Sequence, residues 1–161
     1  MASSEKINGG AEAAPRSGNE VVMDASAAAP WILPDETTEF SERLLEEVLD
    51  GRRSLVVPAL WLYEMLNVLR SGVLRGRITE QQARKGLARI SSIPVELVSA
   101  EAQGEEGILD AALSMKLSAY DATYLHLARS HGIDLVSADP DLLALRDRFP
   151  WIHSVEDFVG H

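Results

Sequence analysis

The sequence predicts an α/β fold, a three-layer α/β/α sandwich with a central, mainly parallel sheet. Short apolar runs rich in β-branched residues, such as 54–57 (SLVV) and 133–138 (IDLVSA), alternate along the chain with longer amphipathic stretches such as 36–50. Strands that alternate with helices pair in parallel, because each crossover helix returns the chain to the same end of the sheet. A parallel sheet is buried on both faces, so helices are expected on each side of it.

The first half of the chain opens on a strand that ends in a carboxylate. Proline at position 34 closes a short helical turn, Gly51 is a stop signal for the next helix, and Pro58 suits the first turn of the helix after that. The helix before Gly51 places Leu44, Leu45 and Val48 on one face. The predicted elements are, in order, a strand at 20–24, a helical turn at 27–33, a helix at 36–50, a strand at 54–57 and a helix at 59–71.

The second half continues the same alternation. Thr79 and Gln82 have the spacing of a capping box, which predicts a helix start, and Gly132 is the expected residue after a helix end. The predicted elements are helix 80–91, strand 95–98, helix 101–115, helix 118–130, strand 133–138, helix 140–147 and a weak strand at 152–154.

Length and composition indicate one folded domain. The chain has 161 residues, the size of a single domain. Residues 1–19 offer no apolar periodicity, so we expect a disordered leader there and a folded domain over 20–161. The leader has no apolar core of a secretory signal, and no stretch is long enough to span a membrane. The absence of cysteine excludes disulfides and thiolate metal sites and favours a cytoplasmic location.

The net charge of −10 bears on possible partners. Proteins that bind nucleic acid mainly through phosphate contacts are expected to be basic. Nucleic-acid binding by this chain would therefore need bound metal cations and a local basic stripe, whereas an acidic surface suits a basic protein partner. The candidate stripe consists of Arg70, Arg75, Arg77, Arg84, Lys85 and Arg89. The alternative interpretation is a solvated face of two helices.

Acids occur where they are costly. Asp24 and Asp139 each end an apolar strand, and the carboxyl ends of parallel strands form the ligand crevice of an open sheet. Glu64 is the only charged residue between Arg53 and Arg70, in a helix with almost no solvent face, and Asp121 is the sole acid of another mostly apolar helix. A buried, unpaired carboxylate costs several kcal/mol or more without compensation.

These four acids together predict a site for Mg²⁺ or Mn²⁺, because carboxylates aimed into one pocket repel and oxygen ligands favour these cations. Three polar neighbours are candidates to support them, namely Ser26, Ser137 and Asn67, the last placed to orient Glu64.

Each acid also has a purely structural interpretation. Asp24 and Asp139 could cap the helices that follow them, and Asp121 follows Ser118 at capping-box spacing. Glu64 could pair with a distant arginine. These readings stay open for each acid taken singly.

With these residues in place, the chain over 20–159 resembles the PIN-domain family and, within it, the VapC-type toxins of bacterial toxin–antitoxin pairs. VVMDASAAAPWILPDE resembles the opening strand with the first acid, Asp24, and VPALWLYEMLNVLRSGVLRGRIT the second motif with Glu64 and Asn67. LSAYDATYLHLARSHGIDLVSADPDL resembles the third and fourth motifs, with Asp121 and Asp139. The leader and the strongly negative charge depart from the pattern.

The resemblance implies a PIN-like α/β/α sandwich, frequently dimeric, that cleaves RNA with Mg²⁺ or Mn²⁺ and is inhibited by a small cognate antitoxin. We expect metal-activated water to attack the phosphodiester and to leave 5′-phosphate and 3′-hydroxyl products. The aromatic and apolar group of Trp61, Tyr63 and Leu66 is expected in the core or at a dimer interface.

Two other classes of function remain as alternatives. One is a catalytically silent interaction module that keeps the PIN fold to bind its partner, but such a module is expected to have lost an acid. The other is a phosphoacceptor receiver-type domain. Receiver domains need paired acids after the first strand and a lysine after a late one, whereas Asp24 is single and no lysine follows Asp139.

Overall fold

The structure is a computed structural model that describes residues 18–160, so positions 1–17 of the expected leader lie outside the described residues. Its centre is a five-stranded sheet in the order β3-β2-β1-β4-β5, in which every neighbouring pair is parallel. This confirms the predicted parallel sheet. The strands are β1 (Glu20–Met23), β2 (Ser54–Pro58), β3 (Val95–Val98), β4 (Asp134–Val136) and β5 (Ile152–His153).

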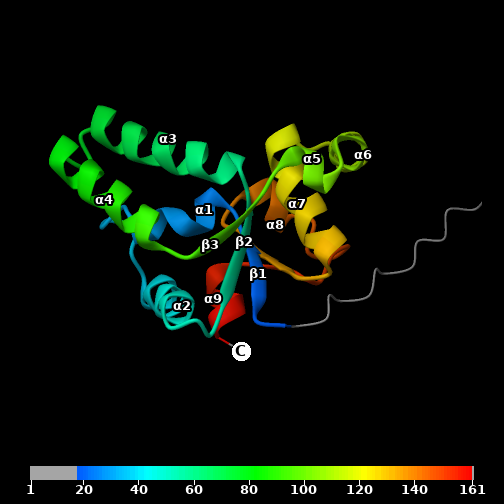
Figure 1. Cartoon of the computed structure of the whole chain (residues 1–161), viewed down its shortest axis with the longest axis horizontal. Coiled ribbons are helices and arrows are strands. Elements are labelled where there is room, and N and C mark those ends of the chain that lie inside the picture. Colours follow the sequence, from blue (N-terminus) through cyan, green and yellow to red (C-terminus); the bar gives the residue numbers. More distant parts are fainter. Residues whose placement is uncertain (1–17, 161) are drawn as a thin grey trace, which may run out of the picture.

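Helices cover both faces of this sheet (Figure 1), as the three-layer prediction requires. On one side α7 (Ala119–His131) packs against β1, β2 and β4, and α6 (Glu105–Met115) packs against α7. The other side carries α1, the 3₁₀ turn η1, α2 and α9, and beside α1 the helices α3 and α4 form a hairpin that projects from the body. Their bounds are α1 (Ala25–Ala28), η1 (Ala29–Trp31), α2 (Glu39–Leu49), α3 (Leu60–Leu74), α4 (Glu80–Ser92) and α9 (Val155–Val159).

Several helix boundaries differ from the predicted ones for local reasons. The helix predicted at 101–115 is two helices, α5 (Ala100–Gln103) and α6, because Gly104 between them has φ +86°. The helix predicted at 140–147 is regular only over α8 (Pro140–Leu143). The sequence pattern missed the short α9, which is capped by Ser154. The capping box of Thr79 and Gln82 is confirmed.

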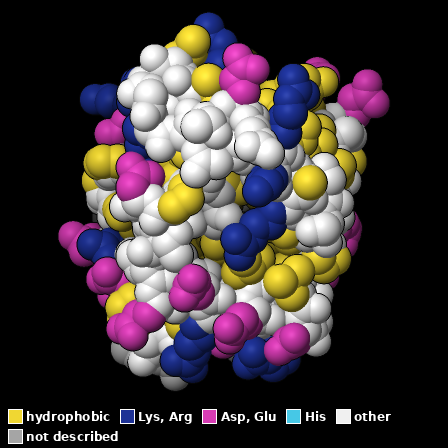
Figure 2. Space-filling view, turned by 90° about the vertical axis from the view of Figure 1, so that its left-hand side faces the viewer, with side chains coloured by type: hydrophobic (Ala, Val, Ile, Leu, Met, Phe, Trp, Pro, Cys, Tyr) yellow, Lys and Arg dark blue, Asp and Glu magenta, His cyan; other side chains and the backbone are white. Residues whose placement is uncertain are grey.

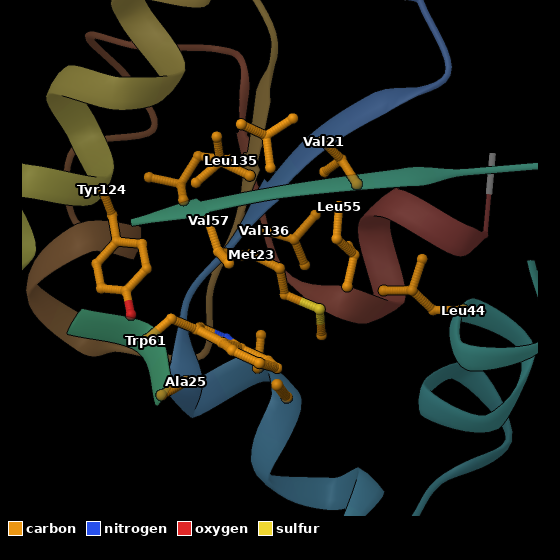
Figure 3. Packing of buried hydrophobic residues seen from close by; sticks show 14 of the residues in the cluster. Val21, Met23, Ala25, Leu44, Leu55, Val57, Trp61, Tyr124, Leu135 and Val136 are labelled. Carbon is orange, nitrogen blue, oxygen red and sulfur yellow. The ribbon is translucent and has the colours of Figure 1, made fainter. Parts of the chain in front are cut away.

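The core lies where side chains of the sheet meet those of the covering helices. Figure 3 shows side chains from the helices around Met23 of β1, namely Leu44 of α2, Trp61 of α3 and Ala25 of α1. The Tyr124 side chain extends from α7 beside the end of β2. Burial of these apolar side chains supplies most of the stabilisation of the fold. The largest fully buried side chains include Trp61, Tyr124, Met23, Leu44, Leu55, Met65, Leu125, Leu127, Leu135, Leu142, Ile152 and Val21.

The order of the strands creates a switch point beside β1. The chain adds β2 and β3 on one side of β1 and then crosses to add β4 and β5 on the other. At such a point the loops after neighbouring strands diverge and leave a crevice at their carboxyl ends. Met23 of β1 is in register with Val136 of β4, so the residues that follow these two strands meet in that crevice. Within residues 18–160 the structure has no helix long and apolar enough to cross a membrane.

Candidate active site

Asp24 is a buried carboxylate at the topological switch point of the sheet. It follows β1, it is only 4% exposed, and its backbone N–H donates to the carbonyl of Val136 in the neighbouring strand. Its Oδ1 accepts hydrogen bonds from the Ser26 hydroxyl (2.6 Å) and the Ala27 N–H (2.9 Å), and its Oδ2 accepts one from the Ser137 hydroxyl (2.5 Å). Asp24 therefore caps α1, as the structural interpretation expected, and its position in the crevice is compatible with a second role.

Ser26 and Ser137 tie the ends of β1 and β4 together. Besides donating to Asp24, the Ser26 hydroxyl accepts from the Ala138 N–H (3.0 Å) and the Ser137 hydroxyl accepts from the Asp139 N–H (2.9 Å). Both serines therefore lie against Asp24, where the sequence placed them. Their hydroxyls fix the direction of the buried carboxylate and link it to the loop that carries Asp139.

Glu64 reaches the crevice from α3 and is held by a residue that the sequence analysis missed. The Tyr124 hydroxyl, on α7, donates a hydrogen bond to Oε2 of Glu64. Asn67, expected to orient Glu64, lines the same cavity as Glu64 and is itself exposed. A signal for this contact was present in the sequence. Tyr124 follows Asp121 by three residues and so lies on the same face of the helix, and a buried tyrosine hydroxyl needs a hydrogen-bond partner.

Asp121 and Asp139 are half-buried and both take part in helix caps. The Ser118 hydroxyl donates to Oδ2 of Asp121 (2.6 Å) at the start of α7. Oδ1 of Asp139 accepts from the N–H groups of Asp141 (2.8 Å) and Leu142 (3.3 Å) at the start of α8. The capping interpretations are thus correct as geometry, and they leave oxygen lone pairs on each carboxylate.

The four acids act on one another electrostatically. Burial raises the pKa of Asp24 above its ordinary value of 3.8, against the lowering effect of the serine hydroxyls, and the charge of Asp139 raises it further. Burial also raises the pKa of Glu64, to which the charges of Asp24, Asp121 and Asp139 add. The acids that the sequence singled out are therefore coupled through their charges in the folded chain.

A fifth acid joins the group from α8. Burial raises the pKa of Asp121, and the charges of Asp139 and Asp141 raise it further. Asp141 was not among the candidates from the sequence, although its position in the run Ala138-Asp139-Pro140-Asp141 was a usable signal.

The donor chemistry of this group fits a hard divalent cation. All of the donors are carboxylate or hydroxyl oxygens, the ligands that Mg²⁺ and Mn²⁺ prefer. Burial disfavours the charged form of the Asp24 carboxylate, and a bound cation would offset that cost. Among residues 18–160, however, no three acidic or histidine side chains stand close enough to form a ready-made metal cluster.

A cavity of about 450 Å³ opens beside this group. Its lining runs from Glu64 to two arginines of the sequence-predicted stripe, Arg75 and Arg77. Arg84 lies elsewhere, in an apolar groove between α3 and α4, and Arg70 is exposed on α3 outside the cavity lining. The full lining of the cavity is Ala25, Ser26, Ala29, Leu33, Glu36, Glu64, Asn67, Val68, Ser71, Arg75 and Arg77.

The aromatic and apolar group on α3 divides between core and surface. Trp61 is fully buried, whereas Tyr63 is 72% exposed and Leu66 is 43% exposed. The two exposed side chains lie on a face of α3 that remains open within the described chain.

An all-parallel sheet in which Asp24 and Asp139 follow the two strands at the topological switch point defines an α/β protein with acids at the carboxyl ends of its central strands. The chain belongs to the PIN domain family, whose model matches residues 21–147 and so spans all four of the predicted acids. It is similar to a protein named ribonuclease VapC3 from Pyrobaculum aerophilum, with 30% identity over 132 residues, 81% of this chain and 95% of that protein.

Solved structures agree on the fold. The crystal structure of PAE2754 from Pyrobaculum aerophilum superposes with a TM-score of 0.67 and 26% identity, covering 88% of this chain and 87% of that one. A toxin–antitoxin complex from Klebsiella pneumoniae superposes with a TM-score of 0.52 and 15% identity, covering 84% of this chain and 97% of that one. At that identity the second match speaks for the fold alone.

The raised pKa values predict that stability falls as pH rises when divalent cations are absent. Asp24, Glu64 and Asp121 bind protons more tightly in the folded than in the unfolded chain, so their contribution is fully present below the ordinary carboxyl values. It is lost as pH rises through the folded pKa values. Thermal unfolding in EDTA, measured from about pH 4 to neutral, should show the decline, and Asp24→Asn should weaken it.

The matched control is Asp110→Asn, which neutralises an exposed acid on α6. This variant should keep the slope of the wild-type chain. Identical slopes for all three proteins would show that the crevice carboxyls are not the groups responsible.

Proposed function

We propose that this protein is a Mg²⁺- or Mn²⁺-dependent endoribonuclease. The observation that carries the proposal is the coupling of four acids at the carboxyl ends of the central strands and on the helices beside them. The charges of Asp24, Asp121 and Asp139 all raise the pKa of Glu64. Membership of the PIN domain family and similarity to a protein named as a ribonuclease support the same activity.

The four carboxylates would hold one or two cations. A divalent cation bound there would supply Lewis-acid activation of water and neutralise negative charge on the phosphodiester oxygens. Ser26 and Ser137 keep the Asp24 carboxylate pointing into the crevice through their hydrogen bonds. Hydrolysis by water places the phosphate on the 5′ end of one product and leaves a 3′-hydroxyl on the other.

Tyr124 is the positioning residue of this site. Its hydroxyl donates to Glu64 and thereby fixes one carboxylate oxygen while the other remains available. Burial and the adjacent Glu64 both raise the pKa of Tyr124, so the hydroxyl stays protonated and remains a donor throughout the physiological range.

We further propose that the protein is the toxin of a toxin–antitoxin pair and acts in the cytoplasm. The net charge of −10 favours a partner with a basic binding segment. A homodimer is also proposed, with Tyr63 and Leu66 as exposed apolar side chains available for an interface.

The direct test is cleavage of labelled total RNA by the purified protein. Cleavage should require Mg²⁺ or Mn²⁺, stop in EDTA, and fall by at least about 100-fold in Asp24→Asn, because a charge-stabilising group at a reacting phosphate contributes factors of this order. Asp110→Asn, an exposed acid, should cleave like the wild type. Cleavage that persists in EDTA or in Asp24→Asn would contradict the assignment. A lack of both cleavage and metal binding would favour a catalytically silent interaction module.

A second test concerns the support of Glu64. Tyr124→Phe removes only the hydroxyl from a buried ring, so it should leave the protein folded, weaken Mn²⁺ binding and lower the cleavage rate by about 10-fold or more. Metal affinity by calorimetry and cleavage rate at saturating Mn²⁺ separate these effects. Tyr120→Phe, on the same helix but 66% exposed, is the control and should be neutral. Equal metal affinities and cleavage rates for Tyr124→Phe and Tyr120→Phe would contradict the positioning role of Tyr124.

A further inference from the structure

One face of α3 connects the acidic crevice to the basic end of the cavity. Glu64, Asn67, Val68, Ser71 and Arg75 all line that cavity. Their spacing of three, four, seven and eleven residues from Glu64 is that of a single helical face. The polar members therefore form one continuous line that starts at a carboxylate of the candidate active site.

Small side chains make up part of the remaining lining of the cavity. Ala25, Ser26 and Ala29, on α1 and η1, line it together with Leu33 and Glu36 from the segment that follows. Small side chains leave room for a ligand to approach the helix along its length. The cavity has a volume of about 450 Å³. The unstacked bases of a single strand are free to enter such a space, whereas the bases of a duplex are stacked and paired.

The two arginines of this cavity differ in their ion pairing: Arg77 is paired with carboxylates, and Arg75 is not paired with any described residue. Arg77 is held by Asp35 (2.8 Å) and Glu36 (2.5 Å), both reaching across from the loop before α2. These acids neutralise its charge and fix its position. Within residues 18–160 no carboxylate lies within ion-pairing distance of Arg75, which is exposed.

The charge of Arg75 matters because the chain as a whole repels polyanions. With a net charge of −10, long-range attraction of RNA is unfavourable. An arginine on the same helix face as Glu64, with no ion pair among the described residues, supplies a local contact for phosphate. Figure 2, which faces the far end of α3 and α4, shows Lys and Arg side chains gathered near the middle of that surface.

We propose that the α3 face defined by Asn67, Ser71 and Arg75 is a binding track for single-stranded RNA, in which Arg75 contacts a phosphate away from the cleaved bond. The rise of an α-helix places Arg75 roughly 16 Å along the axis from Glu64, a distance of a few nucleotides. Asn67 and Ser71 lie between them and offer hydrogen bonds to bases or sugars. The inference rests on the proposed function, since the strand enters with its scissile phosphate at the acids.

The experiment measures binding without cleavage. Asp24→Asn protein, full length, is titrated into a fluorescein-labelled single-stranded RNA of mixed sequence in Mg²⁺, and anisotropy is followed at several salt concentrations. Adding Arg75→Gln should weaken binding about 10-fold, as expected for a charge-assisted contact. It should also reduce the slope of log affinity against log salt by about 0.7, the value for one phosphate contact on a single strand. Circular dichroism checks that the variant is folded.

Two matched variants make the result specific. Arg43→Gln removes the same charge from an exposed arginine on α2 and should leave affinity and salt slope unchanged. Equal effects of Arg43→Gln and Arg75→Gln would overturn the proposal, as would an equal loss from Arg70→Gln, which would indicate diffuse attraction to the basic stripe. Tight, Arg75-dependent binding of a duplex of the same sequence would overturn the assignment to single strands.

Parallel cleavage assays with the wild-type chain separate this inference from the proposed function. RNA binding that depends on Arg75, without metal-dependent cleavage, would contradict the proposed ribonuclease activity and support the binding track. Metal-dependent cleavage, with an RNA affinity that Arg75→Gln leaves unchanged, would support the proposed ribonuclease activity and overturn the binding track. An absence of RNA binding by the Asp24→Asn protein would overturn the track outright.

Discussion

The rest of the structure depends on the placement of a desolvated carboxylate, Asp24, at the end of the central strand. Burial alone destabilises its charged form, so the surrounding fold must compensate. It does so in part through hydrogen bonds from Ser26, Ala27 and Ser137, which come from the loops after β1 and β4. In the proposed function, a bound cation would offset the remaining cost. Structure and proposed chemistry are therefore two consequences of one constraint.

The same side chains serve architecture and site together. Asp24 and Asp139 begin α1 and α8, and Ser118 joins Asp121 at the start of α7. Each cap fixes one carboxylate oxygen while leaving lone pairs available. The parallel sheet brings these helix starts to a single edge, because every strand ends there. Only Glu64 comes from mid-helix, and it needs Tyr124 on the neighbouring helix to hold it.

The sequence predicted the sheet and its parallel pairing, because the hydrophobic periodicity of strands and helices is a local signal. That the four acids form one metal site stays a prediction. Long-range contacts were harder to predict. The donation from Tyr124 to Glu64 joins residues 60 positions apart, so the helical position of Tyr124 alone does not identify its partner. The break at Gly104 depends on its positive φ, and the pairing of Arg77 with Asp35 and Glu36 depends on how two loops meet. Asp141 was not predicted as part of the site, because Asp139 followed by Pro140 is the pattern of an ordinary helix start, in which Asp141 is a first-turn acid.

The central claim is that a divalent cation offsets the charge of these gathered carboxylates. Calorimetric titration of Mn²⁺ into the wild-type chain and Asp24→Asn tests it most directly, in two buffers of different ionisation enthalpy at mildly acidic pH. Because burial raises the pKa values of Asp24, Glu64 and Asp121, cation binding should release protons, and Asp24→Asn should lose most of the affinity. An absence of binding, or binding that releases no protons and is unchanged in Asp24→Asn, would contradict the account.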